Sequence, residues 1–333
     1  MQTGFVNLRN TCYFNTSLQC LLCIDDFRTF VLTYMTSGPL LSHLADMYAL
    51  QPKKPVNPER LLRALASALG DKMHLGEQND MQEFVLLFVA ELAKQLGRTI
   101  DAPVVAKYDR MQRDTALDVD ARFKACMDHA WLLANRREYS AVVPLFFGQQ
   151  IMQLECDRCG DVQHNYENFM SVPLAFPGDR AASSIQRMLD DFMATEAVPS
   201  RRCDGCGRTC AATKMHRMWR LPRVLMLFVK RFDATLRKID ADIEVGPTLD
   251  MTKYYVDRKK PPSSRGEYEL VSVGCHTGSM GSGHYFALCR DDVGAQGAVP
   301  GWKLYDDDCV RTLGSYTDVP SSKYYTLFYR SVN

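Results

Sequence analysis

A cysteine near the N-terminus lies where a helix is expected to begin. Cys12 follows Asn7 and Asn10, and the leucines after it recur at helical spacing. The positive end of a helix dipole favours the thiolate form of a cysteine, which is the reactive form. The amides of Asn7 and Asn10 could donate hydrogen bonds to a developing oxyanion. The alternative is a small buried cysteine at a helix start, with Asn10 as the cap.

A histidine and an acidic turn could complete a site for nucleophilic catalysis. His284 stands in the run Gly281–Ala287, where glycines precede an apolar strand, and this suits a base at the mouth of a cleft. His276, at the end of a neighbouring expected strand, is the rival base. Three consecutive carboxylates begin at Asp306, and one of them could orient the His284 ring as the third member of a triad. The alternatives are a structural histidine and a solvated acidic turn.

Two C-x-x-C pairs, each followed by glycine, are formed by Cys156, Cys159, Cys203 and Cys206. Four thiolates can close a tetrahedral zinc site that has no open position, so such a zinc ion would be structural. The long spacer between the pairs predicts a hairpin there. A redox function is the rival interpretation, and Cys210 could substitute as a ligand. Cys20 and Cys23 lie among leucines in the first expected helix, and we expect them in the core.

A second helix is expected to begin at Asp80, with an apolar stripe that continues to Leu96. Asp80 and Glu83 stand three residues apart at its start. They could form an N-cap with a capping-box partner, or they could offer two carboxylates to a basic peptide. The residues alone do not decide between these two interpretations.

Length and composition limit the class of protein. The chain has 333 residues, 46% of them hydrophobic, and a net charge of +1, which gives no electrostatic reason to expect nucleic acid or a membrane surface as a partner. No apolar run approaches the roughly 20 residues of a membrane-spanning helix. The start of the sequence lacks the pattern of a signal peptide, and the 12 cysteines fit a reducing compartment. We therefore expect a cytoplasmic or nuclear protein.

The sequence changes character at about residue 143, from helical patterns to short apolar runs. Residues 98–140 have a weaker helical pattern, and residues 257–266 form a polar loop. Strands are expected at Val224–Val229, Glu269–Cys275 and Tyr285–Arg290. Helices followed by strands predict an α+β protein.

The motifs, in this order, resemble the catalytic domain of the ubiquitin-specific proteases (peptidase C19), from about residue 4 to 330. Pro144–Gly148 is similar to the strand that enters the fingers of that family, and Leu221–Leu225 with Lys230–Phe232 to its central palm strand. The resemblance implies a papain-like α+β fold in one catalytic domain, residues 1–333. The thumb would be about 1–142, and the palm 143–333, with zinc-bearing fingers at about 150–215.

The resemblance also implies the catalytic residues. Cys12 would be the nucleophile and His284 the general base. Asp306 would orient His284, and Asp307 would help to order the site. Asn7 would donate a hydrogen bond in the oxyanion hole.

Substrate and metal contacts follow from the same resemblance. Asp80 and Glu83 would receive the basic C-terminal tail of ubiquitin, and Tyr285 would line the channel that admits the paired glycines of that tail. The four cysteines of the C-x-x-C pairs would hold a structural Zn²⁺, and no organic cofactor is expected.

The implied function is a thiol protease that cleaves the isopeptide or peptide bond after the last glycine of ubiquitin. Its partners would be ubiquitin and ubiquitinated proteins, without nucleic acid or membrane. We expect a monomer, with an activating partner left open. The alternatives are a weakly active or inactive ubiquitin-binding scaffold, and a protease for another ubiquitin-like modifier.

Overall fold

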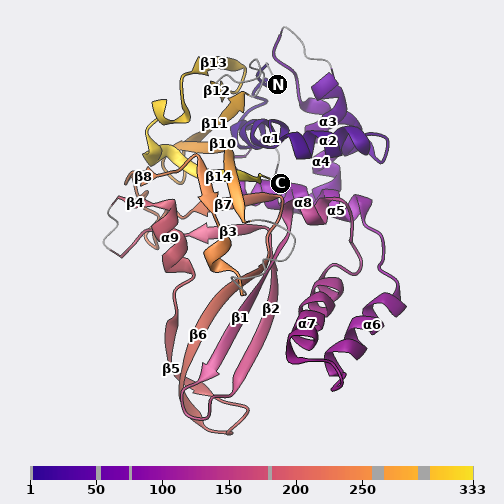
Figure 1. Ribbon diagram of the computed structural model, residues 1–333. Coiled ribbons are helices and arrows are strands. Elements are labelled where there is room, and N and C mark those ends of the chain that lie inside the picture. The colour runs from indigo at the N-terminus through magenta and orange to yellow at the C-terminus, as the bar shows by residue number, and fades with distance from the viewer. Residues whose placement is uncertain are drawn as a thin grey trace.

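The structure is a computed structural model that describes residues 3–49, 54–74, 77–178, 182–256, 266–291 and 301–332. Most of the polar loop at 257–266 therefore lies outside the described residues. Helices come first along the chain, and Figure 1 shows most of them on one side of the molecule. They are α1 (Cys12–Leu22), α2 (Asp25–Thr33), α3 (Pro39–Ala49), α4 (Glu59–Leu69), α5 (Met81–Leu96), α6 (Ala102–Arg113), α7 (Val119–Ala134), α8 (Val142–Phe146) and α9 (Ile185–Phe192). None of the described helices has both the length and the apolar composition of a membrane span.

The largest sheet has eight strands and forms the centre of the molecule. Seven of them follow the order β13-β12-β11-β10-β14-β7-β3, and β9 pairs with β10. Their bounds are β3 (Ser171–Leu174), β7 (Val224–Val229), β9 (Thr248–Asp250), β10 (Glu267–Gly278), β11 (Gly283–Asp291), β12 (Gly301–Asp306), β13 (Cys309–Leu313) and β14 (Tyr324–Ser331). Two short 3₁₀ helices, η3 (Tyr316–Asp318) and η4 (Ser321–Lys323), precede β14.

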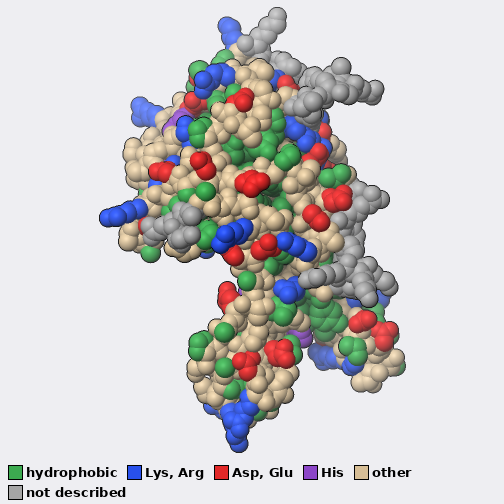
Figure 2. Space-filling model, turned by 60° about the vertical axis from the view of Figure 1, so that its left-hand side comes forward, with side chains coloured by type: hydrophobic (Ala, Val, Ile, Leu, Met, Phe, Trp, Pro, Cys, Tyr) green, Lys and Arg blue, Asp and Glu red, His purple; other side chains and the backbone are tan. Residues whose placement is uncertain are grey.

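A second, four-stranded sheet has the order β2-β1-β6-β5. It is built from β1 (Gly148–Cys156), β2 (Val162–Phe169), β5 (Glu196–Arg202) and β6 (Thr209–Arg220). Figure 1 shows this sheet extending away from the larger one, and Figure 2 shows it as a narrow lobe below the main body. A short parallel pair, β4 (Ser183–Ser184) with β8 (Ile243–Glu244), lies apart from both sheets.

Helix α1 is buried along its whole length, because it lies between the large sheet and the other helices. Its contacts are with β10, β11 and β12 on the sheet, and with α2 and α5 among the helices. Tyr13 and Phe14 place their rings 5.6 and 5.4 Å from the ring of Phe84 on α5. The first turn of α1, which carries Cys12, is therefore fixed by aromatic packing.

Most expected elements are confirmed, and one is wrong. A helix begins at Cys12, α5 has Asp80 as its N-cap, and β7 has the expected bounds. Pro144–Gly148 was expected as a strand, but α8 occupies most of it and β1 begins only at Gly148. Proline is tolerated in the first turn of a helix. A short run that is apolar at every position has no hydrophobic periodicity, so its sequence does not distinguish a helix from a strand. The division into subdomains stays a prediction.

Arg231, in the segment after β7, is the largest of the fully buried side chains in the described residues, with 1% of its surface exposed. Its guanidinium donates to four carbonyl oxygens, those of Ile239, Ala241, Ser321 and Tyr324, at 2.6 to 3.0 Å. Burial lowers the pKa of Arg231 to about 10, so the side chain remains charged at neutral pH. One cation thus joins the segment after β7 to η4 and β14.

We expect Arg231→Met to destabilise the protein by at least about 3 kcal/mol, because buried carbonyls without a donor cost about 1–3 kcal/mol each. The measurement is the midpoint of chemical unfolding, followed by circular dichroism. The control is Arg63→Met, at an exposed arginine that pairs with Glu59 on the surface of α4, and its midpoint should change little. Equal effects of the two substitutions would contradict this account of Arg231.

Candidate active site

The Cys12 thiol lies at the first residue of α1, with Thr11 as the N-cap. The loop before it is held by the side chain of Asn7, whose Oδ1 accepts from the backbone N–H and the hydroxyl of Thr11, both at 3.2 Å. Asn10 adopts a φ of 48°, which turns the chain sharply into the helix. Cys12 is 6% exposed, so its sulfur is reached only from a limited direction.

His284 connects Cys12 to an acid. Its Nε2 donates to Asp306 Oδ1 at 2.6 Å, from the start of β11 to the end of β12. The pKa of His284 is raised to about 9, first by its interaction with the Cys12 sulfur and then by Asp306, although burial opposes the change. The structure thus brings together three of the residues that the sequence singled out, with His284 between Cys12 and Asp306.

Asp307 joins the turn after β12 to the N-terminal segment. Its carboxylate accepts from Asn7 Nδ2 at 2.8 Å and from Asn15 Nδ2 at 2.7 Å, and its backbone oxygen accepts from Phe5 N at 2.8 Å. Gly4 allows this approach, because a Cβ there would lie 2.3 Å from the Asp307 oxygen. The Asn7 amide has two hydrogens and gives one to Asp307, which leaves the other for an oxyanion.

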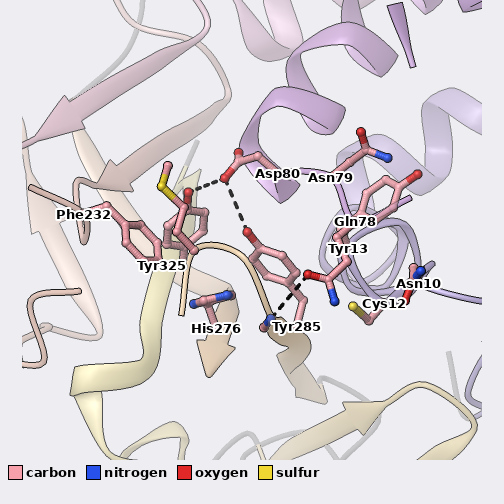
Figure 3. Close-up of a pocket in the computed structure, with 12 residues that line it drawn as sticks. Asn10, Cys12, Tyr13, Gln78, Asn79, Asp80, Phe232, His276, Tyr285 and Tyr325 are labelled. Carbon is pink, nitrogen blue, oxygen red and sulfur yellow. Dashed lines mark hydrogen bonds between the residues drawn. The ribbon is translucent and has the colours of Figure 1, made fainter. Parts of the chain in front are cut away.

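A pocket of about 160 Å³ opens beside Cys12 (Figure 3). Asp80 lines it, and its carboxylate caps α5 through Glu83 N–H and accepts from the hydroxyls of Tyr285 and Tyr325. Gln78 Oε1 accepts from Gly283 N at 3.4 Å across the rim. Asp80 is therefore an N-cap and a pocket residue at once. Glu83 is exposed and is not among the pocket residues.

His276, the rival base, has a different environment from His284. It is 4% exposed, and its ring lies among the rings of Phe232, Tyr285 and Tyr325 at 4.7 to 5.8 Å. Burial lowers its pKa to about 4, so it is neutral where His284 is charged. A Cβ at Gly283 would lie 2.1 Å from His276 Nε2, which explains the glycine before His284.

The four cysteines of the C-x-x-C pairs converge at the tip of the four-stranded sheet. Their sulfur atoms all lie within 4.8 Å of one another. The two turns have the same hydrogen bond, from Gly160 N to Cys156 O at 2.8 Å and from Gly207 N to Cys203 O at 2.9 Å. Backbone N–H groups lower the pKa values of Cys156 and Cys206. Four thiolates at this spacing fit a tetrahedral metal ion such as Zn²⁺.

Two other cysteine predictions can be compared with the structure. Cys210 Sγ lies 3.2 Å from Cys156 Sγ but does not belong to the group of four. Cys20 is fully buried in the core, and Cys23 packs against it, as expected.

Sequence reasoning missed Asn15, Gln78 and Tyr325. Asn15 lies one helical turn after Cys12, and its 2% exposure is unusual for an amide. A polar residue on the buried side of an apolar helix could have indicated its function. No local pattern indicates Tyr325, because its partner Asp80 is 245 residues away.

Comparison with known proteins identifies a family. The family described as "Ubiquitin carboxyl-terminal hydrolase" matches residues 3–329. Ubiquitin carboxyl-terminal hydrolase 4 of Eremothecium gossypii is 25% identical over 99% of this chain and 42% of its own length. Human ubiquitin carboxyl-terminal hydrolase 21 is 28% identical over 98% of this chain and 61% of its own length. The chain thus spans less than two thirds of these relatives.

Similar solved structures confirm the predicted α+β papain-like fold. Two are described as the SAGA Ubp8/Sgf11/Sus1/Sgf73 DUB module, one bound to ubiquitin aldehyde and one, with a substituted Ubp8, bound to monoubiquitin. The matched chains have TM-scores of 0.72 and 0.71 and identities of 21% and 19%. Each match covers 99% of this chain, and 70% or 69% of the other.

The charge on His284 gives a first prediction for the site. The pKa of His284 is raised above the ordinary 6.5, so the charged His284 stabilises the folded state through its interactions with Cys12 and Asp306. This stabilisation is fully present below pH 6.5 and is lost as the pH rises through about 9. Asp306→Asn removes one raising charge, so the pKa of His284 should fall. The measurement is an NMR titration of the His284 ring. Asp308→Asn, at an exposed neighbouring acid, is the control, and an equal shift in both variants would contradict the assignment.

The cysteine cluster gives a second prediction. Cys206→Ser should lose bound zinc and Cys210→Ser should keep it, because Cys206 is one of the four grouped sulfurs and Cys210 is not. The measurement is the zinc content of each purified protein, with its melting temperature as a second readout. The reverse pattern would place Cys210 in the ligand set instead.

Proposed function

Because the chain belongs to the ubiquitin carboxyl-terminal hydrolase family, we propose that it is a cysteine protease that cleaves ubiquitin from other proteins. The bond cleaved is the isopeptide or peptide bond after the C-terminal glycine of ubiquitin. The observation that carries the proposal is the pair of contacts made by His284, one with the Cys12 sulfur and one with Asp306. Cys12 itself lies at the N-terminus of a helix and lines a pocket.

In the first step the Cys12 thiolate attacks the carbonyl carbon of the last glycine. The oxygen becomes negative, and the free hydrogen of the Asn7 amide, with a backbone N–H near Cys12, stabilises it. The His284 imidazolium gives its proton to the departing lysine amine, and the C–N bond breaks. A thioester between ubiquitin and Cys12 remains. Asp306 keeps the imidazole oriented and favours its charged form.

In the second step His284 is neutral and acts as a base. It removes a proton from water, the water attacks the thioester carbonyl, and the C–S bond breaks to release ubiquitin with a free carboxylate. Asp307 acts through its neighbours, because it holds Asn7 and Asn15 in place. It is therefore a positioning residue in this mechanism.

The pocket beside Cys12 would admit the C-terminal tail of ubiquitin. Tyr285 forms one wall, and its hydroxyl is anchored on Asp80, which supports a rigid, narrow channel. Two glycines fit a channel of this kind because they have no side chains. Asp80 and the exposed Glu83 place negative charge near the entrance for a basic tail.

A zinc ion would be held by Cys156, Cys159, Cys203 and Cys206. It would supply a structural crosslink at the tip of the four-stranded sheet, which has few large apolar residues of its own. None of these ligands lies near Cys12 in the sequence or in the same sheet as His284, so the metal takes no part in the two chemical steps.

Ubiquitin and ubiquitinated proteins are the proposed partners, and the matched Ubp8 chains, described as bound to ubiquitin aldehyde and to monoubiquitin, support this. Ubp8 is described together with Sgf11, Sus1 and Sgf73, which keeps an activating partner in the proposal. A cytoplasmic or nuclear location is proposed from the sequence alone.

Labelling by ubiquitin that carries a C-terminal electrophile tests the proposal. The native chain should form a stable adduct with one ubiquitin, and Cys12→Ala should form none, because only a thiolate activated by His284 attacks at that position. Cys309→Ser is the matched control, since Cys309 is an exposed thiol opposite Asp306 in the β12–β13 hairpin. It should label as the native chain does, and mass spectrometry reads the result.

Three outcomes would contradict parts of this function. Ubiquitin binding without any adduct would favour a binding scaffold. An adduct with another ubiquitin-like modifier but not with ubiquitin would change the substrate. Loss of the adduct in Cys309→Ser but not in Cys12→Ala would overturn the choice of nucleophile.

A further inference from the structure

A second pocket, of about 400 Å³, begins at His284 and Asp306, and we call it the leaving-group pocket. It lies on the opposite face of strands β10 and β11 from the pocket beside Cys12. His276 and Tyr285 are paired across these strands and face the Cys12 pocket, whereas the next pair, Thr277 and His284, lines the leaving-group pocket. Successive side chains of a strand point to opposite faces, so one strand pair separates the two pockets.

The floor of the leaving-group pocket is apolar and belongs to the sheet. Phe286 on β11, Leu304 on β12 and Leu313 on β13 line it. The strand register agrees with a common floor, because Leu304 on β12 pairs with Leu288 on β11 and with Arg311 on β13. Segment η3–η4 forms the far wall with Val319, Pro320 and Lys323, and the buried Arg231 holds η4 there through the Ser321 carbonyl.

Two cations at this pocket have no partner in the described part of the chain. Arg311 is exposed and Lys323 is half-buried, and neither makes an ion pair or side-chain hydrogen bond with a described residue. The acids that line the pocket are already engaged. Asp306 is bound by His284, and Asp318 accepts from the N–H groups of Gly314 and Ser315 at 2.8 and 3.1 Å. The acids of this lining thus have partners, whereas Arg311 and Lys323 have none among the described residues and are the side chains available to pair with a carboxylate.

The chemistry of acyl transfer assigns an occupant to this position. His284 must face the amine that leaves, so the scissile bond lies between Cys12 and His284. The acyl half occupies the pocket beside Cys12, and the other half of the substrate has to continue past His284. The leaving-group pocket is the hollow that His284 itself lines.

We propose that this pocket binds the segment around the modified lysine of the substrate protein and prefers acidic residues there. The inference rests on the proposed deubiquitinating function and adds a sequence preference to it. The apolar floor takes the aliphatic part of the segment, and Arg311 and Lys323 pair with carboxylates beside the lysine. Pairs of this kind, at the edge of a pocket, select among substrates more than they add affinity.

The test uses ubiquitin linked through an isopeptide bond to the lysine of a short peptide. One peptide has acidic residues on both sides of the lysine, and its matched partner has the corresponding amides. Each kcat/KM is divided by that of the same protein for a ubiquitin amide of a small fluorophore, which has no flanking residues. This division removes any general loss of activity from the comparison.

The native chain should prefer the acidic peptide roughly three- to fivefold at low salt, as two exposed ion pairs allow, and less at high salt. The double variant Arg311→Glu, Lys323→Glu should prefer the amide peptide instead. The control is Arg60→Glu, at an exposed arginine on α4, which reverses one charge far from this pocket in the sequence and should keep the native preference.

A native chain that cleaves the fluorophore substrate but shows no preference between the peptides would overturn this inference alone. A preference that survives in the double variant would also overturn it, because another surface would then carry the selection. If the native chain does not cleave even the fluorophore substrate, the proposed function fails, and this inference fails with it.

Discussion

The candidate site depends on one contact, between the turn after β12 and the segment before α1. Asp307 contributes both carboxylate oxygens and its backbone oxygen to this contact, and it binds Asn7, Asn15 and Phe5. Cys12 belongs to the helical side of the molecule, and His284 and Asp306 belong to the sheet. Their alignment requires that these two sides keep a fixed distance, and a charge-assisted hydrogen-bond network is stiffer than apolar packing alone. A glycine at position 4 is the steric condition for this approach.

The two histidines next to the pocket show how position in a sheet determines chemical function. His276 and His284 lie on paired strands and face opposite sides. His276 is enclosed by aromatic rings, and its pKa falls to about 4, whereas the sulfur and the carboxylate beside His284 raise its pKa to about 9. At neutral pH the first is therefore an uncharged packing residue and the second an imidazolium. The residue type is the same, and the environment decides what each can do.

Local patterns in the sequence predicted most of the site, and contacts between distant residues limited the prediction. The helix that begins at Cys12, the cap at Asp80 and the two C-x-x-C turns each depend on residues within a few positions of one another. Asn15 could not be predicted in this way, because its partner is 292 residues away. The short distance between Cys210 and Cys156 likewise depends on the register of β1 with β6. Residues 144–146 were misjudged because a short, wholly apolar run has no helical or strand period.

The contact between Asn7 and Asp307 joins residues 300 positions apart, and this has a consequence for synthesis in the cell. A ribosome makes the chain from its N-terminus at about 5–20 residues per second, so Cys12 emerges well before the turn that will hold its loop. During that interval the cysteine has neither His284 nor Asp306 beside it, and the candidate site of the nascent chain is incomplete. The residues of the candidate site therefore come together only after the turn at Asp307 has been translated and has met the segment before α1. The long sequence separation thus delays assembly of the candidate site until late in synthesis.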